Sequence, residues 1–526
     1  MLTVASSLMV TIFPNGLPID QSHESKIGLP ACHRPSIAAN LLRQSVDPAG
    51  SPVESRLTGT LAAKRTQQRL SLISRHLDQR LPLPELNTPF STERNSLAPD
   101  DVEYKPVDRT SSTTTATPPS PSPTPTPTPT PAPPSPTTAN MSAQAPHPTL
   151  LIPGPIEFDD AVLQSMAHYA ESHVAPGFVK TFGETLALTR KLFQSSNPAA
   201  QPFVISGSGT LGWDIVASNL IEKDENALVL HTGYFADSFA NCLQTYGAHA
   251  TQLKAPIGER PSFEEIEQAL KEKPYKIITI THVDTSTGVL SDIKRVAEVV
   301  RRVSPQTLVV VDGVCSVGCE EIAFDEWDID VVLTASQKAI GCPPGLSILM
   351  LSGRAIETFK TRKTPPSSYY ASIANWLPIM QNYEAFKPSY FATPPTQLVH
   401  ALHTTLSHIT ARPMHERFSI HAAASDRVKA AIAELGLQQV AAKRENQAHA
   451  MTAIWLPEGL APPDVLPGLL KRGVIFAAGL HKDVATRYIR FGHMGVSVTD
   501  PKRTDIDDAL AALKEALTEA KQAKGL

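Results

Sequence analysis

The sequence has little cysteine, little excess charge and no long apolar run. Five cysteines among 526 residues are too few to frame a secreted scaffold with disulfides. No stretch approaches the ~18 apolar residues of a membrane span, so we expect no membrane partner. A formal net charge of -4 indicates no polyanion-binding surface, and we expect no nucleic-acid partner either.

Proline, by contrast, is abundant, and many of the 47 prolines lie in TSSTTTATPPSPSPTPTPTPTPAPPSPTT at 110–138. Alternating proline fixes φ and removes backbone donors, which predicts an extended spacer without helix or sheet. Residues 1–13 carry no Lys or Arg ahead of their apolar stretch, which speaks against a secretory signal. Residues 34–80, rich in Arg, Ser and Leu, fit a disordered tail better than an organelle transit peptide. We therefore predict that residues 1–140 form a disordered extension rich in Pro, Ser and Thr.

The character of the sequence changes at Met141. Proline alternation stops there, and apolar runs with the spacing of strands and helices begin. We predict that the functional unit starts close to Met141, which is also a candidate start codon. The remainder to Leu526 is long enough for one large domain and one smaller one.

From Gln201 onward, short apolar runs alternate with helical segments. The runs are rich in β-branched residues, as in strands that are buried on both faces. Strands joined by helical crossovers predict an α/β fold with a mostly parallel sheet. We predict strands at 202–206, 227–231, 275–283, 307–314, 330–336 and 346–351. Helices are predicted at 236–246 and 291–303, the second with Ser291 as its N-cap.

Ligands of such sheets bind at the carboxyl ends of the strands. The segment SGSGT at 206–210 lies at such an end and opens a helix. Its glycines and free N–H groups, together with the helix dipole, favour a phosphate group. Taken alone, the same residues fit a plain tight turn equally well.

Asp312 and Lys338 occupy two further strand ends. Asp312 closes the apolar run VVVD, where a carboxylate needs a partner: a protonated ring nitrogen, or a structural cap or ion pair. Lys338, in TASQKAIGCPPG, has small uncharged neighbours. Such a lysine can have a lowered pKa and form a Schiff base, or it can be a surface lysine whose stem lies on apolar residues.

In combination and order, these segments resemble the class V, fold-type I pyridoxal-phosphate aminotransferases, in particular the alanine–glyoxylate and serine–glyoxylate enzymes. The resemblance runs from about Pro148 to the C-terminus and covers nothing before Met141. It implies an N-terminal arm and a large cofactor-binding domain at 141–395, and a small α+β domain at 396–526. The segments that carry it are PGP (153–155), SGSGT (206–210), THVDTSTGV (281–289), VDGVCSVG (311–318), SQKAIGCPPG (336–345), YFATPP (390–395) and YIRFGHMG (488–495).

The resemblance implies pyridoxal 5'-phosphate as the cofactor and a homodimer with shared active sites. Lys338 matches the catalytic lysine that forms the Schiff base, and Asp312 matches the partner of the pyridine nitrogen. Phosphate contacts are implied for Ser208, Gly209 and Thr210 and, from the neighbouring subunit, for Tyr390 and Thr393.

The remaining matched positions surround the cofactor ring and the substrate. Phe235 falls where the family stacks an aromatic ring on the cofactor, commonly Trp, and a phenyl face can also stack. Thr285 falls near the cofactor's phenolic oxygen, and Gln337 matches a ligand of the phosphate or the substrate pocket. Arg490 matches the arginine that binds the substrate carboxylate, to which its planar fork is suited. Gly154 is implied to lie close to the substrate.

The implied reaction moves the amino group of alanine, or of serine, to glyoxylate, giving glycine and pyruvate or hydroxypyruvate. Amino acids and 2-oxo acids are thus the expected small-molecule partners. Relatives occur in peroxisomes, mitochondria and the cytosol, and we expect one of these intracellular locations. The C-terminal Lys-Gly-Leu does not match the peroxisomal Ser-Lys-Leu signal.

Two other functions stay open at this point. Cysteine desulfurases share the fold and the lysine but need a nucleophilic cysteine, whereas Cys315, Cys319 and Cys342 are predicted to be buried thiols. A non-catalytic binding protein would act through the proline-rich segment. No metal is expected, because His282 and His493 have no second ligand at metal spacing and are predicted to be packed. The apolar stripe of the last helix is predicted to face the core.

Overall fold

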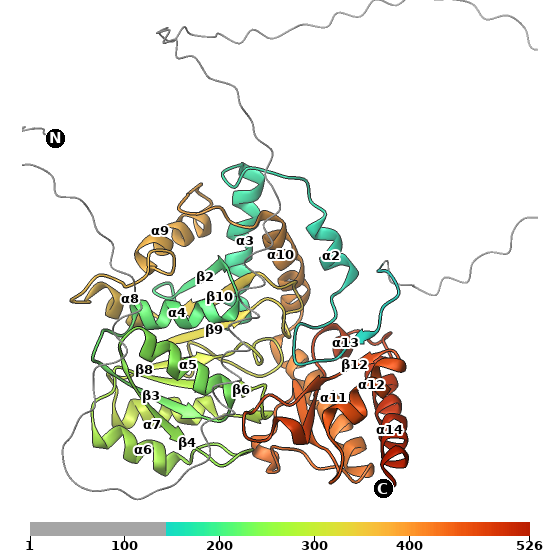
Figure 1. Ribbon diagram of the computed structural model, residues 1–526. Helices are drawn as coiled ribbons and strands as arrows, with labels where there is room; N and C mark the ends of the chain where they lie inside the picture. Colours follow the sequence, from blue (N-terminus) through green and yellow to red (C-terminus); the bar gives the residue numbers. More distant parts are fainter. Residues whose placement is uncertain (1–143) are drawn as a thin grey trace, which may run out of the picture. The chain divides into compact units, whose positions relative to one another are not determined.

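The computed structural model describes residues 144–526, and the predictions for residues 1–140 and Met141 lie outside this range. A seven-stranded sheet forms the centre of the larger part of the described chain (Figure 1), with the strand order β2-β10-β9-β8-β5-β3-β4. The strands from β9 to β4 are parallel, whereas β10 is antiparallel to both of its neighbours. The strands are β2 (Gln201–Ser206), β3 (Asn226–His231), β4 (His249–Lys254), β5 (Ile277–Thr281), β8 (Leu308–Asp312), β9 (Val331–Ala335) and β10 (Leu346–Leu351).

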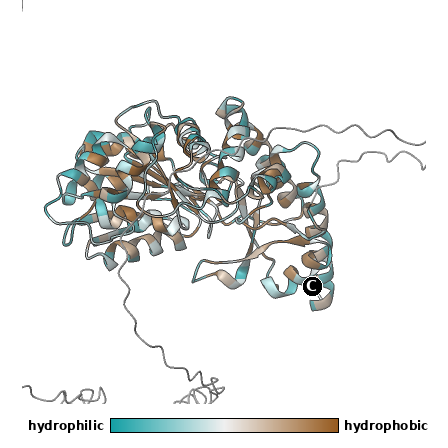
Figure 2. Cartoon of the chain, turned by 90° about the horizontal axis from the view of Figure 1, so that it is seen from above, coloured by the Kyte–Doolittle hydropathy of each residue, from teal (hydrophilic) through white to brown (hydrophobic). Residues whose placement is uncertain are grey.

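The predicted α/β fold with a mostly parallel sheet is confirmed. Strands β5, β8, β9 and β10 are buried at every position, as their β-branched runs indicate. Strand β2 tolerates Pro202 because it lies at the edge of the sheet, where one side needs no ladder hydrogen bond. The other edge strand, β4, was missed because HATQLK is mostly polar and half-exposed. Figure 2 shows hydrophobic residues along the central strands and mixed faces on the surrounding helices.

Helices flank this sheet. Helix α4 packs on β9 and β10, α5 on β3 and β4, and α3 packs on α10. Helix α7 begins one residue later than predicted: its N-cap is Asp292, which accepts from the N–H of Arg295, whereas the Ser291 hydroxyl donates to the Thr281 carbonyl. The helices of this part are α2 (Asp160–Met166), α3 (Pro176–Leu192), α4 (Gly209–Asn219), α5 (Tyr234–Thr245), α6 (Phe263–Glu272), α7 (Ile293–Val303), α8 (Gly353–Lys360), α9 (Ile373–Glu384) and α10 (Thr396–Thr410).

A second, smaller core lies towards the C-terminus. It surrounds a three-stranded antiparallel sheet in the order β11-β14-β13, and the apolar stripe of α14 faces this core, as predicted. Apolar residues of α10 belong to the larger core instead, and the predicted domain boundary after residue 395 stays a prediction. The elements here are α11 (Met414–Glu434), β11 (Met451–Trp455), α12 (Pro462–Lys471), β12 (Val474–Ile475), β13 (Ala477–Ala478), β14 (Tyr488–Gly492), α13 (Val496–Thr499) and α14 (Asp505–Lys524).

Short elements complete the fold. The chain enters the described range beside the smaller core, where β1 pairs with β12 in parallel. A small hairpin follows strand β5 and carries Ser286, Thr287 and Gly288, here called the STG segment, in its turn. The short elements are β1 (Thr149–Leu150), β6 (Val283–Asp284), β7 (Val289–Leu290) and the 3-10 turns η1 (Arg444–Asn446) and η2 (Ala485–Arg487). Among the described helices, none combines the length and the apolar character that a bilayer span requires.

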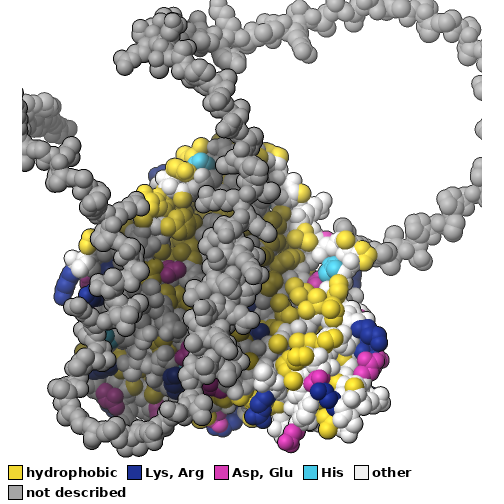
Figure 3. Space-filling view, viewed as in Figure 1, with side chains coloured by type: hydrophobic (Ala, Val, Ile, Leu, Met, Phe, Trp, Pro, Cys, Tyr) yellow, Lys and Arg dark blue, Asp and Glu magenta, His cyan; other side chains and the backbone are white. Residues whose placement is uncertain are grey.

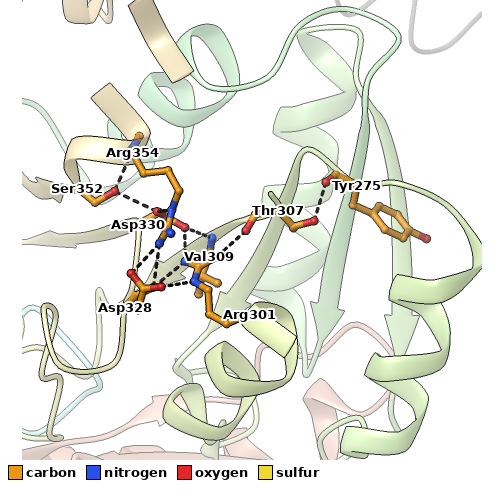
Figure 4. Close-up of polar contacts among 9 residues, drawn as sticks. Tyr275, Arg301, Thr307, Val309, Asp328, Asp330, Ser352 and Arg354 are labelled. Atoms are coloured by element: carbon orange, nitrogen blue, oxygen red, sulfur yellow. Dashed lines mark hydrogen bonds and ion pairs between the residues drawn. The ribbon is translucent and has the colours of Figure 1, made fainter. Parts of the chain in front are cut away.

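A buried carboxylate, that of Asp330 directly before β9, joins strands and helices at the amino ends of the parallel strands. Asp330 is fully buried and pairs with Arg301 of α7 and Arg354 of α8, each at 2.6 Å (Figure 4). It also accepts from the backbone N–H of Val309 at 2.7 Å and from the hydroxyl of Ser352 at 3.0 Å. Because each of its two oxygens accepts two hydrogen bonds, this charge can be held in the core.

Candidate active site

Predicted site residues from five separate segments converge on one cavity of about 150 Å³. The cavity lies at the carboxyl ends of the parallel strands, where a ligand of such a sheet is expected. Asp312 and Lys338 both line it, so the two residues on which the sequence argument depended share one site. Its lining comprises Ser208, Gly209, Thr210, Trp213, Phe235, Thr281, Val283, Thr285, Asp312, Val314, Cys315, Gln337 and Lys338.

The N-terminus of α4 forms one wall of the cavity. Ser208 is the N-cap, yet its side chain makes no capping hydrogen bond, which leaves the hydroxyl and the first helical N–H groups available. Gly209 is required by close packing, since a Cβ atom there would lie 2.8 Å from a methyl group of Val314. Free N–H groups at the positive end of a helix dipole favour an anion such as phosphate.

Asp312 is buried at the end of β8, at 3% exposure. Its Oδ1 accepts from the N–H of Val314 at 3.0 Å, and its Oδ2 accepts from the indole Nε1 of Trp213 at 2.8 Å. Burial raises the pKa of this carboxyl to about 6, against the effect of the two donors. No cation touches the carboxylate among the described residues, so it can accept a further N–H from a ligand.

Lys338 follows β9 and is also buried, at 9% exposure. Burial lowers the pKa of its ammonium group, which favours the neutral, nucleophilic amine. The Nζ atom donates to the carbonyl of Pro153. Gly154 adopts φ +90°, and a Cβ atom at this position would collide with the lysine side chain. Gly154 therefore lies directly against Lys338, and its predicted proximity to the substrate stays a prediction.

Phe235 is aimed at the cavity by the STG segment. It is the second residue of α5, whose first N–H, that of Tyr234, donates to the Ser286 hydroxyl at 2.9 Å. That hydroxyl in turn donates to Asp284 Oδ1 at 2.6 Å. Asp284 is fully buried, and burial raises its pKa. The segment thus fixes the start of α5 and with it the predicted stacking ring.

Arg490 projects from β14 towards the cavity rim. Its Nη1 donates to the carbonyl of Thr285, a cavity residue, at 3.2 Å, and its Nε donates to Ala478 at 2.7 Å. Two residues earlier, the Tyr488 hydroxyl donates to the Ser286 carbonyl and accepts from the N–H groups of residues 480 and 481. These bonds leave Arg490 Nη2 without a hydrogen-bond partner among the described residues, and its predicted role in binding the substrate carboxylate stays a prediction.

Tyr390 and Thr393 do not line this cavity. Tyr390 is 60% exposed and its ring lies against His173 at 4.7 Å, and Thr393 is exposed. Both residues were predicted to serve the neighbouring subunit, and exposure on the surface of a single chain is what that role requires.

Five residues of the cavity lining were not among the predicted site residues: Trp213, Thr281, Val283, Val314 and Cys315. Trp213 lies one helical turn after Gly209, so its position on the phosphate-binding helix was a usable signal. Cys315 follows Asp312 by three residues and lines the cavity, but burial raises the pKa of its thiol to about 12. The prediction that Cys315, Cys319 and Cys342 are buried is confirmed.

The predicted packed histidines are also confirmed. His282 is 4% exposed and burial lowers its pKa to about 4, while His493 is fully buried and shares a hydrogen bond with Thr452. A different group, His168, Glu171 and His400, brings three ligand-type atoms within 4.8 Å. Its two imidazole rings are stacked 3.9 Å apart at 15°. An imidazole nitrogen binds a ligand in the plane of its own ring. Because the two ring planes are nearly parallel, they do not meet at one nearby point, so the rings suit a shared carboxylate better than one common ion.

The residues present fit a phosphate-bearing pyridine aldehyde. Gln337 Oε1 is buried in the cavity wall and has no hydrogen-bond partner among the described residues, so it can accept from a donor group of a ligand. The uncapped helix N-terminus suits the phosphate, and Asp312 suits a protonated ring nitrogen. Lys338 supplies the amine that an aldehyde needs.

Comparison with known proteins agrees with this fit. The family model described as aminotransferase class-V matches residues 153–494, more than half of the chain. Alanine–glyoxylate aminotransferase 1 of Saccharomyces cerevisiae is 43% identical over 71% of this chain and 98% of its own length. Serine–glyoxylate aminotransferase of Methylorubrum extorquens is 27% identical over 66% of this chain and 86% of its own length.

Solved structures show the same architecture. The crystal structure of alanine–glyoxylate aminotransferase from Nostoc sp. aligns with a TM-score of 0.65 and 28% identity, and covers 72% of this chain and 97% of that one. With the converged lysine, aspartate and helix N-terminus, these matches establish that the chain belongs to the pyridoxal-phosphate-dependent class V aminotransferase family.

Proposed function

We propose that this protein transfers the amino group of alanine, or of serine, to glyoxylate. The observation that carries the proposal is the meeting of Lys338, Asp312 and the α4 N-terminus in one cavity, with Arg490 at its rim. The yeast relative, at 43% identity, is named for alanine and glyoxylate, and more distant relatives are named for serine and glyoxylate. Both donors are therefore retained.

Each residue has a physical task in this reaction. The α4 N-terminus holds the cofactor phosphate, and Asp312 pairs with the ring nitrogen and keeps it protonated. When bound, pyridoxal phosphate supplies an aldehyde for amine exchange and a ring that accepts the electrons left when the substrate's α-proton is removed. Lys338 Nζ takes that proton as general base and returns it as general acid.

Arg490 orients the substrate. Its planar guanidinium can hold an α-carboxylate in a two-point contact, which both an amino acid and a 2-oxo acid possess. Glyoxylate and the amino donor can therefore use one site in turn, as in a ping-pong cycle.

The test is a set of half-reactions. Purified protein is mixed separately with alanine, serine and cysteine, and loss of the visible absorbance of the lysine-linked cofactor is followed. We expect conversion by alanine or serine, and glycine formation after glyoxylate is added. Sulfide release from cysteine without transamination would instead favour a desulfurase, although Cys315 is buried and its thiol pKa is raised to about 12.

We further propose that the active unit is a homodimer. Large hydrophobic side chains are exposed around Tyr390, including Tyr369 at 79% and Phe386 at 56%, and Figure 3 shows hydrophobic surface where α9 and α10 lie in Figure 1. A partner copy seated here would cover these rings and bring Tyr390 and Thr393 to the neighbouring phosphate site.

Subunit complementation tests this arrangement. A mixed dimer of Lys338→Ala and Tyr390→Ala chains has one site in which both residues are intact, if Tyr390 serves the neighbour. We expect the mixture to recover up to about a quarter of wild-type activity by random pairing. Absence of recovery, with a dimer present in light scattering, would contradict sharing.

We propose an intracellular location, in the peroxisome, mitochondrion or cytosol. The support is the occurrence of relatives in these compartments. Imaging of the protein with a tag placed internally, leaving both ends free, distinguishes the three, and secretion of the protein would contradict the proposal.

A further inference from the structure

Helix α4 reaches both ends of the cavity. Its N-cap Ser208 and first residue Gly209 form the wall that suits an anion, and one turn later Trp213 donates to the carboxylate of Asp312. The indole Nε1 donates to Asp312 Oδ2 at 2.8 Å in a buried setting, across 99 residues of sequence. One rigid helix thus sets the spacing between the phosphate site and the group that meets the ring nitrogen.

The indole itself is held firmly. Trp213 is 7% exposed and stacks on Phe239, with centroids 5.4 Å apart at 16°. The ring of Phe235 packs against it edge-on, at 6.5 Å and 63°. Phe235 and Phe239 lie one turn apart on α5, so the predicted stacking ring and the indole support each other.

The Asp312 carboxylate depends on this donor. Among the described residues, its only hydrogen bonds come from Trp213 and from the N–H of Val314, one to each oxygen. An indole N–H can donate but never accept, so it always presents a proton to Oδ2. Losing it would leave a buried acceptor unpaired and the carboxyl group free to rotate.

We propose that Trp213 is a positioning residue for transamination, whose indole N–H holds the Asp312 carboxylate in the orientation that meets the ring nitrogen of bound pyridoxal phosphate. The role of Trp213 in turnover rests on the proposed function. Its effect on cofactor binding can be measured whichever substrates the enzyme uses.

Three variants separate the hydrogen bond from the packing. Trp213→Phe removes the N–H but keeps an aromatic ring against Phe239. Trp213→His restores a ring N–H at a similar distance from the backbone. Phe239→Leu is the matched control, since it removes the stacked ring and leaves the indole N–H in place. Thermal unfolding of all three full-length proteins establishes that they fold.

The deciding measurement compares two cofactors by direct titration: pyridoxal phosphate and its deaza analogue, in which carbon replaces the ring nitrogen. We expect Trp213→Phe to weaken binding of pyridoxal phosphate about tenfold, the loss of about one charged hydrogen bond, and to leave the analogue almost unaffected. Trp213→His should recover part of the loss, and Phe239→Leu should affect both cofactors alike.

Turnover gives a second measure. With a working amino donor, Trp213→Phe should lower kcat at least tenfold with little change in substrate KM, and should move the pH midpoint of the cofactor absorbance. Equal weakening of both cofactors by Trp213→Phe, or no weakening, would overturn the proposal and leave Trp213 a packing residue. If no donor is converted, the proposed function fails while the titration still decides the role of Trp213.

Discussion

The Nζ atom of Lys338 donates a hydrogen bond to the carbonyl oxygen of Pro153, a residue 185 positions earlier in the chain. The next residue, Gly154, packs against the aliphatic part of the same lysine. The amine is therefore confined between the turn after β9 and the segment that follows β1. This places the amine at a defined position, and burial lowers its pKa.

Replacement of Lys338 tests the central assignment. Lys338→Ala should lower transamination by about 10⁴-fold or more and remove the visible band of the lysine-linked cofactor, since no other amine lines the cavity among the described residues. The matched control is Lys429→Met. Lys429 is also a buried lysine whose pKa is lowered, to about 8, but it contacts Ala448 outside the cavity. A Lys338→Ala protein that keeps both band and activity contradicts the assignment.

Gly154→Ala should displace the lysine. A Cβ atom at Gly154 would lie 2.7 Å from Lys338 Nζ, closer than non-bonded contact allows. We expect a loss of cofactor band intensity and a fall in kcat of about 100-fold, measured at saturating substrate. Gly436→Ala is the control, because Gly436 also has positive φ, +72°, but open space around it. Both variants share the backbone strain, so equal activity of the two would disprove the steric argument.

Arg490→Ala should raise KM for amino acids and 2-oxo acids together. Removing a charged two-point contact costs about 1.5–3 kcal/mol, which corresponds to roughly 10- to 100-fold in KM. Steady-state kinetics with each substrate varied in turn provides the measurement. Arg487→Ala, which removes an exposed arginine over the Trp455 ring, should leave both constants near wild type. An unchanged KM in Arg490→Ala would exclude this arginine as the carboxylate anchor.

Asp312 makes the cofactor-free protein pH-sensitive. Burial raises its pKa from 3.8 to about 6, so its contribution to stability is present below about pH 3.8 and is lost as the pH rises through about 6. Asp312→Asn removes this buried charge. Its unfolding free energy relative to wild type should therefore improve between about pH 4 and 7, by up to about 3 kcal/mol, in urea titrations without cofactor. A difference that is flat across this range would contradict the buried charge.

The Asp330 network predicts a stability effect that leaves the active site unchanged. Asp330→Ala leaves Arg301 and Arg354 without their buried partner and should cost about 3–5 kcal/mol in unfolding free energy. Asp328 pairs with the same two arginines but its side chain is 55% exposed, so Asp328→Ala should cost about 1 kcal/mol or less. Chemical denaturation measures the unfolding free energy of both variants. Similar losses would show that burial of the carboxylate does not determine how much stability is lost.

Local sequence patterns were enough to predict the strands that are buried on both faces and the polar residues at which these strands end. A run such as LVVVD needs a dry environment on both sides, and the carboxylate that closes it is expected at the carboxyl end of the strand, so Asp312 could be placed without coordinates. The same patterns failed for β4, whose polar edge position removes the apolar signal, and for the N-cap of α7, where Ser291 and Asp292 are both good caps.

The order of residues along the chain therefore set the fold class, the cavity's lysine and aspartate, and the helix whose N-terminus lines the cavity. Tertiary packing alone decided that Trp213 donates to Asp312, that Gly154 confines Lys338, and that Tyr390 faces away from its own cavity. The physical reason is that secondary structure follows from periodicity over a few residues. These contacts instead depend on which surfaces meet once strands from distant segments pair and bury their faces.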